Sequence, residues 1–245
     1  MEGFFIFDIG MIKKITTGVL VFYFFIFLLD NLSLAWDRYI VQFLVLAGLN
    51  ILAFVFFLKE YSINDIVNSI KKSKPILFYS GFIILSALSI IVADNQIESL
   101  IVFSQYLTFF FALLLIYNLS KNSKIKFEDL FIKLCLISIF LESGYILLIF
   151  FDNVIINGES FSRLNIYRGF AANINIAAFS LVAKSPAVFY YLYKSNKIIS
   201  KVLSGLLVFV IASCLLILLS RGAFAAFATV IFLIVIYTTI KKMQK

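Results

Sequence analysis

The sequence contains no histidine, and only 14% of its residues are charged. Histidine is the commonest general base and the commonest metal ligand, so we expect no metal site and no cofactor. A soluble domain has about a quarter of its residues charged, and this deficit excludes an aqueous fold. The two cysteines, Cys135 and Cys214, lie inside apolar runs, where a free thiol behaves as a small hydrophobic group.

Apolar residues make up 63% of the chain, and the mean hydropathy is +1.07. A helix needs about 20 consecutive apolar residues to cross a bilayer. Only helices are expected, because an open strand in lipid would leave its backbone polar groups unpaired. The sequence therefore predicts an all-α fold, a polytopic transmembrane helical bundle that forms a single transmembrane domain over residues 1–245. Its eight predicted spans are residues 13–32, 39–58, 75–93, 98–119, 130–151, 171–193, 199–219 and 222–240.

The lysines follow the predicted spans: all except Lys184 lie in every second gap or at the ends of the chain. Cytoplasmic loops carry an excess of lysine and arginine, so this alternation predicts that both termini are cytoplasmic. It also explains the net charge of +8 better than nucleic-acid binding does, and no nucleic-acid partner is expected. Because the small-residue site after the first apolar run is poor, we expect an uncleaved first span.

The cytoplasmic gap 59–74 carries apolar residues at helical spacing, namely Ile63, Ile66, Val67 and Ile70. Residues at i, i+3, i+4 and i+7 share one face of a helix. Lysines follow this face, which is typical of a short amphipathic helix that lies on an anionic membrane surface. A plain cytoplasmic loop is the alternative.

All four arginines fall in gaps that should face away from the cytoplasm, where no lysine occurs. A guanidinium group can bind phosphate through two parallel hydrogen bonds, which an ammonium group cannot do. Arg38 lies in a short gap and is interpreted as a boundary charge. Arg163 and Arg168 precede Asn173 and Asn175 at the start of a predicted span, where a helix end favours anions. In the alternative interpretation the arginines solvate a loop and the asparagines cap the helix.

Arg221 interrupts an otherwise continuous apolar run from Val202 to Tyr237. One helix over this run would hold the guanidinium deep in lipid, at a cost of roughly 3 kcal/mol. A tight outer turn avoids this cost, because Gly222 permits a turn and Ser220 can hydrogen-bond locally. Arg221 and Ser220 are therefore candidate ligand-binding residues, and a simple turn without a ligand is the alternative.

Two charged residues, Glu142 and Lys184, lie inside predicted spans. Lone charges in lipid are costly, so we expect adjacent antiparallel spans to pair them. Pro186 frees the carbonyl of Val182, which is a second acceptor available to Lys184. The pair could couple a proton or an ion, or it could link two helices, and both interpretations stay open.

Two of these segments together resemble the O-antigen ligase and O-antigen polymerase family. Members commonly have an arginine and a glycine before an Asn-Pro-Asn-like segment, and then a Ser-Arg-Gly turn. The corresponding segments here are Arg168-Gly169, Asn173-Ile174-Asn175 and Ser220-Arg221-Gly222. Isoleucine stands in place of the middle proline, and the resemblance is clearest over residues 163–240.

The resemblance implies an inverting, metal-independent glycosyltransferase at the outer face of the bacterial inner membrane, in lipopolysaccharide or surface polysaccharide biosynthesis. Such a protein takes a glycan from an undecaprenyl-pyrophosphate carrier and joins it to lipid A-core or to another glycan. The resemblance also implies that Arg221 binds the pyrophosphate. If the last three predicted spans pack together, Arg163 and Arg168 converge with Arg221 on one outward site.

Family members continue into further spans and a large outer loop with another arginine and a histidine that is proposed to activate the acceptor. This chain has neither, so we expect the N-terminal part of a longer protein or a shortened relative, and its catalytic residues stay unassigned. Asp152 and Glu159 could act as bases, but nothing in their spacing singles them out. Two other functions stay open: a transporter or flippase for a lipid-linked anion, coupled through Glu142 and Lys184, and a membrane scaffold subunit.

Overall fold

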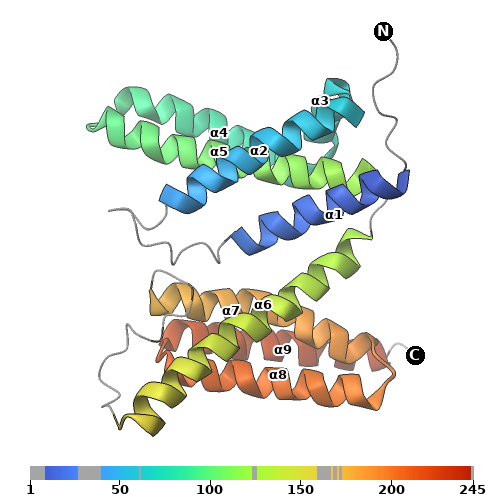
Figure 1. Cartoon of the computed structure of the whole chain (residues 1–245), viewed down its shortest axis with the longest axis vertical. Helices are drawn as coiled ribbons and strands as arrows, with labels where there is room; N and C mark the ends of the chain where they lie inside the picture. Colours follow the sequence, from blue (N-terminus) through green and yellow to red (C-terminus); the bar gives the residue numbers. More distant parts are fainter. Residues whose placement is uncertain are drawn as a thin grey trace. The chain divides into compact units, whose positions relative to one another are not determined.

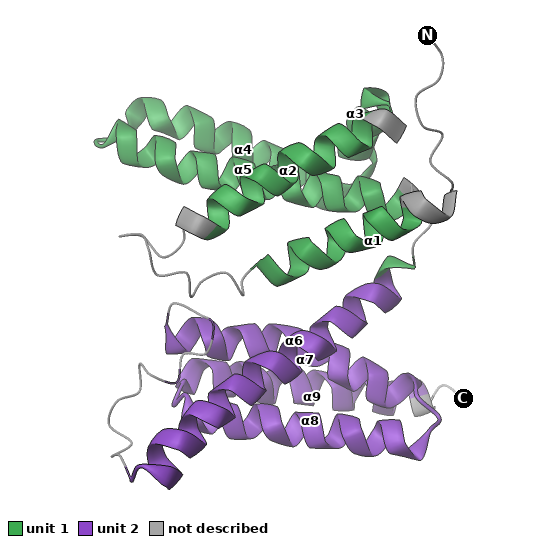
Figure 2. Ribbon diagram, viewed as in Figure 1, with its two compact units in different colours: residues 1–127 green, residues 128–245 purple. Residues whose placement is uncertain are grey.

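The structure is a computed structural model that describes residues 9–26, 40–60, 62–122, 126–158, 167, 170 and 173–243. Within these residues all regular structure is helical and no strand occurs (Figure 1). The all-α prediction is confirmed. The chain divides into two compact units, unit 1 (residues 1–127) and unit 2 (residues 128–245), and each has its own apolar core (Figure 2).

The helices of unit 1 are α1 (Ile9–Phe25), α2 (Ile40–Glu60), α3 (Ile63–Lys72), α4 (Lys74–Ser89) with the 3₁₀ turn η2 (Ile90–Val92), and α5 (Gln96–Asn122). Both α2 and α4 pack against α5, and α1 contacts α2 and α5. Buried apolar side chains such as Phe57 and Leu119 fill the space between them. The long helix α5 is therefore the centre of this unit.

A buried asparagine joins three helices of unit 1. Asn50 of α2 accepts a hydrogen bond from the Tyr23 hydroxyl of α1 at 2.7 Å. Its amide donates to the carbonyl of Thr108 in α5 at 2.9 Å. Polar side chains associate helices in membranes because hydrocarbon offers them no other partner. This network fixes α1, α2 and α5 relative to one another.

The segment predicted as an amphipathic helix is α3, so a plain loop is excluded there. The four apolar residues of its face divide into two pairs. Ile66 and Ile70 pack into the interior of unit 1, whereas Ile63 and Val67 are exposed. Contact with a membrane surface stays a prediction, and only the exposed pair is free to make it.

The helices of unit 2 are α6 (Phe127–Phe150) with the π-helical turn η3 (Phe151–Ile156), α7 (Ile174–Lys194), α8 (Ile198–Ile217) and α9 (Arg221–Met243). α7 packs against both α8 and α9, and α8 also contacts α9. Ile139 and Ile146 of α6 join Leu181 of α7 and Ile211 of α8 in one core. The core places the four helices in a single bundle.

Helix α7 continues through Pro186, which cannot donate a backbone hydrogen bond to the carbonyl of Val182. The hydroxyl of Ser185 donates to this carbonyl at 2.8 Å. The carbonyl predicted as an acceptor for Lys184 therefore has a nearer donor. A serine beside the proline thus supplies the hydrogen-bond donor that this backbone carbonyl would otherwise lack in an apolar environment.

Six helices in the described part of the chain are long and apolar enough to cross a membrane, which indicates a multi-pass membrane protein. They run over Lys74–Val92, Gln96–Lys121, Phe127–Ile156, Ile174–Lys194, Ile198–Ile217 and Arg221–Lys241. The first two predicted spans overlap α1 and α2, which are not among the six. Gln42–Leu58 and Ile63–Lys72 would together add a seventh only as one span, with a bend of 110° between them.

Candidate functional site

The connection between α8 and α9 is a tight turn, as the sequence predicts. α8 ends at Ile217 and α9 begins at Arg221. The turn depends on Leu219, which has a left-handed backbone conformation with φ of 49°. The prediction that Gly222 makes the turn is wrong, because Gly222 already lies in the first turn of α9. Its hydrogen faces the Phe179 ring, where an added Cβ would be 3.5 Å away in ordinary contact.

A hydrogen bond joins the two segments that carry the family resemblance. The Ser220 hydroxyl, which is buried, donates to Oδ1 of Asn175 at 3.0 Å. Ser220 also caps α9, because its carbonyl accepts from the amide of Phe224 at 3.0 Å. Segments 45 residues apart therefore meet where α7 and α9 both begin.

The two predicted asparagines have different roles. Asn173 is the N-cap of α7, and its Oδ1 accepts from the amide of Ile176 at 2.9 Å. Asn175 lies two residues further along, in the first turn of α7, and is joined to Ser220 instead. Asn173 therefore matches the capping interpretation, while Asn175 ties the start of α7 to the turn before α9.

Arg221 is exposed at the first position of α9. Among the residues that the structure describes, its guanidinium group has neither an ion pair nor a hydrogen bond. The amino-terminal end of a helix also carries partial positive charge, from unpaired backbone amides and the aligned peptide dipoles. Positive charge is therefore concentrated here and is available to a ligand.

Beside Arg221 lies an apolar groove of about 580 Å³. Its walls come from the end of α8 and the first turns of α9, and they comprise Leu215, Leu216, Leu219, Ser220, Arg221, Phe224 and Ala225. An apolar groove with a cationic group at its end matches an amphipathic anion, because the apolar part of the ligand contacts apolar side chains and the anionic part meets the guanidinium group. The groove could not be predicted from the sequence, because a leucine that lines a groove and a leucine that faces lipid give the same apolar pattern.

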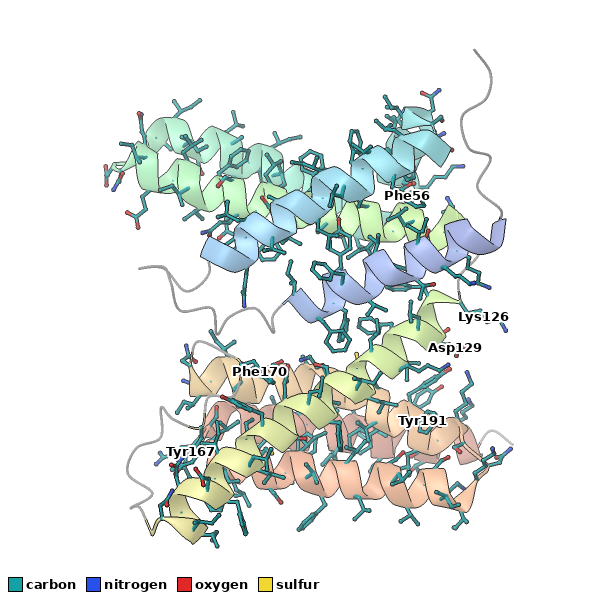
Figure 3. All side chains as sticks on the ribbon, in the orientation of Figure 1. Phe56, Lys126, Asp129, Tyr167, Phe170 and Tyr191 are labelled. Carbon is teal, nitrogen blue, oxygen red and sulfur yellow. The ribbon has the colours of Figure 1, made fainter. Side chains whose placement is uncertain are left out.

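Arg38, Arg163 and Arg168 lie outside the described residues. The convergence of Arg163 and Arg168 with Arg221 therefore stays a prediction. Tyr167 and Phe170 are described, and both pack on α6 (Figure 3). The Tyr167 ring is buried, with its centroid 6.0 Å from that of Phe150, and Phe170 stacks on Tyr145 at 4.7 Å.

The structure pairs the two intramembrane charges. Lys184 of α7 donates to the carboxylate of Glu142 on α6, which is buried. Ser180 contributes to both partners: its hydroxyl donates to Glu142 Oε2 at 3.1 Å and accepts from Lys184 Nζ at 2.7 Å. The hydroxyl of Ser138 donates to Glu142 Oε1 at 3.3 Å. The polar groups thus satisfy one another, as buried charges in a membrane require.

Comparison with models of protein families, with curated proteins and with solved structures finds no match to this chain. In the described residues no group of three or more histidine, cysteine, aspartate or glutamate side chains could hold a metal ion. The candidate site therefore rests on its own geometry: an unpaired arginine at a helix start, an apolar groove, and the serine–asparagine bond that joins two helix ends.

Proposed function

We propose that the chain is an O-antigen ligase- or polymerase-like protein that binds an undecaprenyl-pyrophosphate-linked glycan at the outer face of the bacterial inner membrane. In this proposal it belongs to lipopolysaccharide or surface polysaccharide biosynthesis, with lipid A-core or another glycan as the acceptor. The chain would cross the membrane eight times with both termini in the cytoplasm, as its lysines predict.

The observation that carries the proposal is the hydrogen bond between Ser220 and Asn175. The family resemblance rests on two separate segments of the sequence. If both belong to one binding site, they must lie close together in the fold. Their contact supports a common site at the starts of α7 and α9.

The groove beside Arg221 supports a lipid-linked anion as the ligand. A polyisoprenoid chain is apolar and would lie along Leu216 and Phe224, while the diphosphate would meet the guanidinium at the end of the groove. A guanidinium group binds two phosphate oxygens at once, so it fixes the orientation of the diphosphate as well as its charge. Binding and orienting the carrier is the part of the reaction that the described residues can perform.

The proposal is tested by lipid binding. The full chain would be placed in nanodiscs and titrated with undecaprenyl pyrophosphate or with undecaprenol, which has the same chain and no charge, and binding would be followed by native mass spectrometry. Arg221→Lys should weaken diphosphate binding about tenfold, because one point of contact replaces two. Undecaprenol binding should not change.

Lys241→Ala is the matched control, because it removes one positive charge from the other end of the same helix. This variant should bind undecaprenyl pyrophosphate as the unchanged chain does. Equal binding of the diphosphate by Arg221→Ala and by the control would contradict the proposal, as would binding of undecaprenol with the same affinity as the diphosphate.

The ion pair between Glu142 and Lys184 favours a second candidate, a transporter or flippase for a lipid-linked anion. Charges inside a membrane bundle often mark an ion or proton path. This function requires that Glu142→Gln stops movement of a labelled lipid across a reconstituted membrane while Arg221→Lys has a smaller effect. The ligase-like function requires that Arg221→Lys has the larger effect and Glu142→Gln the smaller one.

A further inference from the structure

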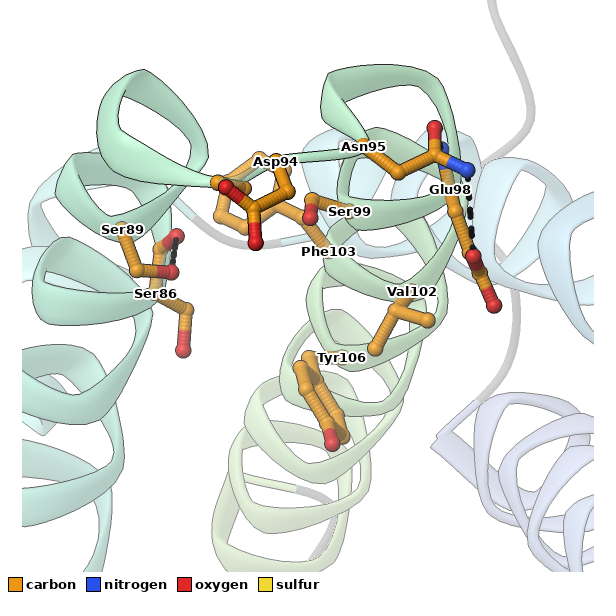
Figure 4. Close-up of a pocket in the computed structure, with 10 residues that line it drawn as sticks. Ser86, Ser89, Asp94, Asn95, Glu98, Ser99, Val102, Phe103 and Tyr106 are labelled. Atoms are coloured by element: carbon orange, nitrogen blue, oxygen red, sulfur yellow. Dashed lines mark hydrogen bonds between the residues drawn. The ribbon is translucent and has the colours of Figure 1, made fainter.

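A polar cavity of about 340 Å³ lies between α4 and α5 in unit 1, beside the turn that joins them (Figure 4). Its lining comes from the end of α4, the turn, and the first two to three turns of α5. The polar members are Ser86, Ser89, Asp94, Asn95, Glu98 and Ser99. Phe103 and Tyr106 lie further along α5. The cavity belongs to neither the predicted site residues nor the groove beside Arg221.

Packing deeper in the hairpin explains why the cavity exists. The rings of Tyr79 and Phe110 meet with their centroids 5.6 Å apart, and those of Phe82 and Tyr106 meet at 5.2 Å. The Tyr79 hydroxyl also donates to the carbonyl of Tyr106 at 3.2 Å. These aromatic pairs pack α4 against α5. Serine side chains at the end of the hairpin are too small to fill the space that remains.

Several polar groups in the cavity are not used by the protein itself. Ser89 donates to the carbonyl of Ser86 at 2.7 Å. Within the residues that the structure describes, the carboxylate of Asp94 and the hydroxyls of Ser86 and Ser99 have no hydrogen-bond partner. In Figure 4 Asp94 lies between the two helices, Ser99 lies on α5 and Ser86 on α4. Three unengaged groups therefore face one space from three different parts of the hairpin.

The second carboxylate is already engaged. Glu98 Oε2 accepts from the amide of Asn95 at 3.2 Å, and Asn95 Oδ1 accepts from the backbone amide of Glu98 at 3.1 Å (Figure 4). This reciprocal pair caps the start of α5. Asp94 and the remaining oxygen of Glu98, both at an exposed surface, supply fewer side-chain ligands than the six or more oxygens that a divalent cation takes.

The chemistry of the cavity disfavours an anion and suits a ligand with many hydroxyl groups. A carboxylate accepts hydrogen bonds and repels anions, and a serine hydroxyl both donates and accepts. Phe103 and Tyr106 add an apolar aromatic surface to the same cavity. A pyranose ring has this combination, with hydroxyl groups around its edge and C–H groups on its face. A phosphate or a uronic acid would meet the charge of Asp94 without a cation to balance it.

We propose that the cavity between α4 and α5 binds one ring of a neutral saccharide. The inference goes beyond the proposed function, because it depends on unit 1 alone and does not need Arg221 or a lipid carrier. On the topology predicted by the lysines, this turn faces away from the cytoplasm.

Binding would be measured with the full chain in nanodiscs by saturation-transfer NMR at millimolar ligand. The probes are a panel of neutral disaccharides that includes maltose, lactose and chitobiose, together with glucuronic acid and spermidine. At least one neutral disaccharide should bind, and glucuronic acid should not. Asp94→Asn and Ser99→Val should each weaken that binding about fivefold, because each removes one hydrogen bond of ordinary strength.

Ser80→Val is the matched control, because Ser80 lies on α4 outside the cavity and donates to its own helix at Leu77. It should leave binding unchanged, and circular dichroism would show that all variants keep their helices. The inference is overturned if no neutral disaccharide binds, if spermidine alone binds, or if Asp94→Asn and Ser99→Val bind as the control does.

The measurement would be repeated in an Arg221→Ala background. Saccharide binding should persist there, since the cavity lies in the other unit. A chain that has lost diphosphate binding and still binds the disaccharide separates the two proposals. Loss of saccharide binding in this background would overturn the assignment to the cavity between α4 and α5.

Discussion

Breaking the ion pair between Glu142 and Lys184 should destabilise unit 2 far more than removing both charges. Lys184→Met leaves the Glu142 carboxylate in the bundle with only the hydroxyls of Ser138 and Ser180 as donors. Glu142→Gln leaves the ammonium group with Ser180 at 2.7 Å and a neutral amide in place of its counter-ion. Each single change therefore strands one charge inside an apolar core.

The magnitude follows from the burial of the pair. The two side chains are 17% and 8% exposed, so solvent screens neither charge well. An unpaired charge in such a site costs about 3 kcal/mol, which we expect for each single variant. The double variant, Glu142→Gln with Lys184→Met, loses only an interhelical link, at about 1 kcal/mol. The coupling energy between the two positions should then be several kcal/mol.

Reversible unfolding of the purified chain in mixed detergent, followed by circular dichroism, measures all four members of the cycle. Ser213→Ala on α8 serves as a control, because its hydroxyl bonds only its own helix at Phe209 and it contacts neither charge. Its effect should add to that of Lys184→Met. If the double variant is as unstable as the sum of the singles, or if either single loses less than about 1 kcal/mol, the pair does not stabilise the bundle.

Two further changes address the turn between α8 and α9. Leu219→Gly should raise the free energy of unfolding by about 1 kcal/mol, because a left-handed backbone strains leucine and not glycine. Thermal unfolding in the same detergent would measure the change. An unchanged or lower free energy of unfolding would argue against strain at Leu219. Ser220→Ala should lower it by about 1 kcal/mol and weaken undecaprenyl-pyrophosphate binding, because Asn175 loses its partner. Asn173→Ala should lower the free energy of unfolding and leave undecaprenyl-pyrophosphate binding unchanged, since Asn173 caps its own helix. Equal loss of binding in Ser220→Ala and Asn173→Ala would contradict a special role for Ser220.

The sequence predicted the helices well because apolar length decides them. Each predicted span overlaps one helix, since any run of this length must pair its backbone internally in lipid. The tight turn was also predicted, but the residue that makes it was not. Gly222 carries the strongest turn signal, whereas Leu219 adopts the left-handed conformation. The start of α9 at Arg221 fixes where the chain must reverse, and that constraint overrides local preference.

The candidate site was predicted only where charge marks it. Glu142 and Lys184 stand out in an apolar run, and their pairing could be inferred from depth alone. The bond between Ser220 and Asn175 depends on how α7 and α9 pack, which no local pattern encodes. The serines of the α4–α5 cavity were overlooked because serine is common in membrane helices, where a small side chain usually allows close packing.

The network around Asn50 also bears on the time at which unit 1 can assemble. As the chain is made, Tyr23 can donate to the amide oxygen of Asn50 once α2 has formed. The amide hydrogens still lack the carbonyl of Thr108, which lies 58 residues further along the chain. If α1 and α2 cross the membrane as the sequence predicts, their hairpin enters lipid with an unsatisfied donor, and the arrival of α5 removes this penalty. A single asparagine thus makes the completion of unit 1 depend on the synthesis of its last helix.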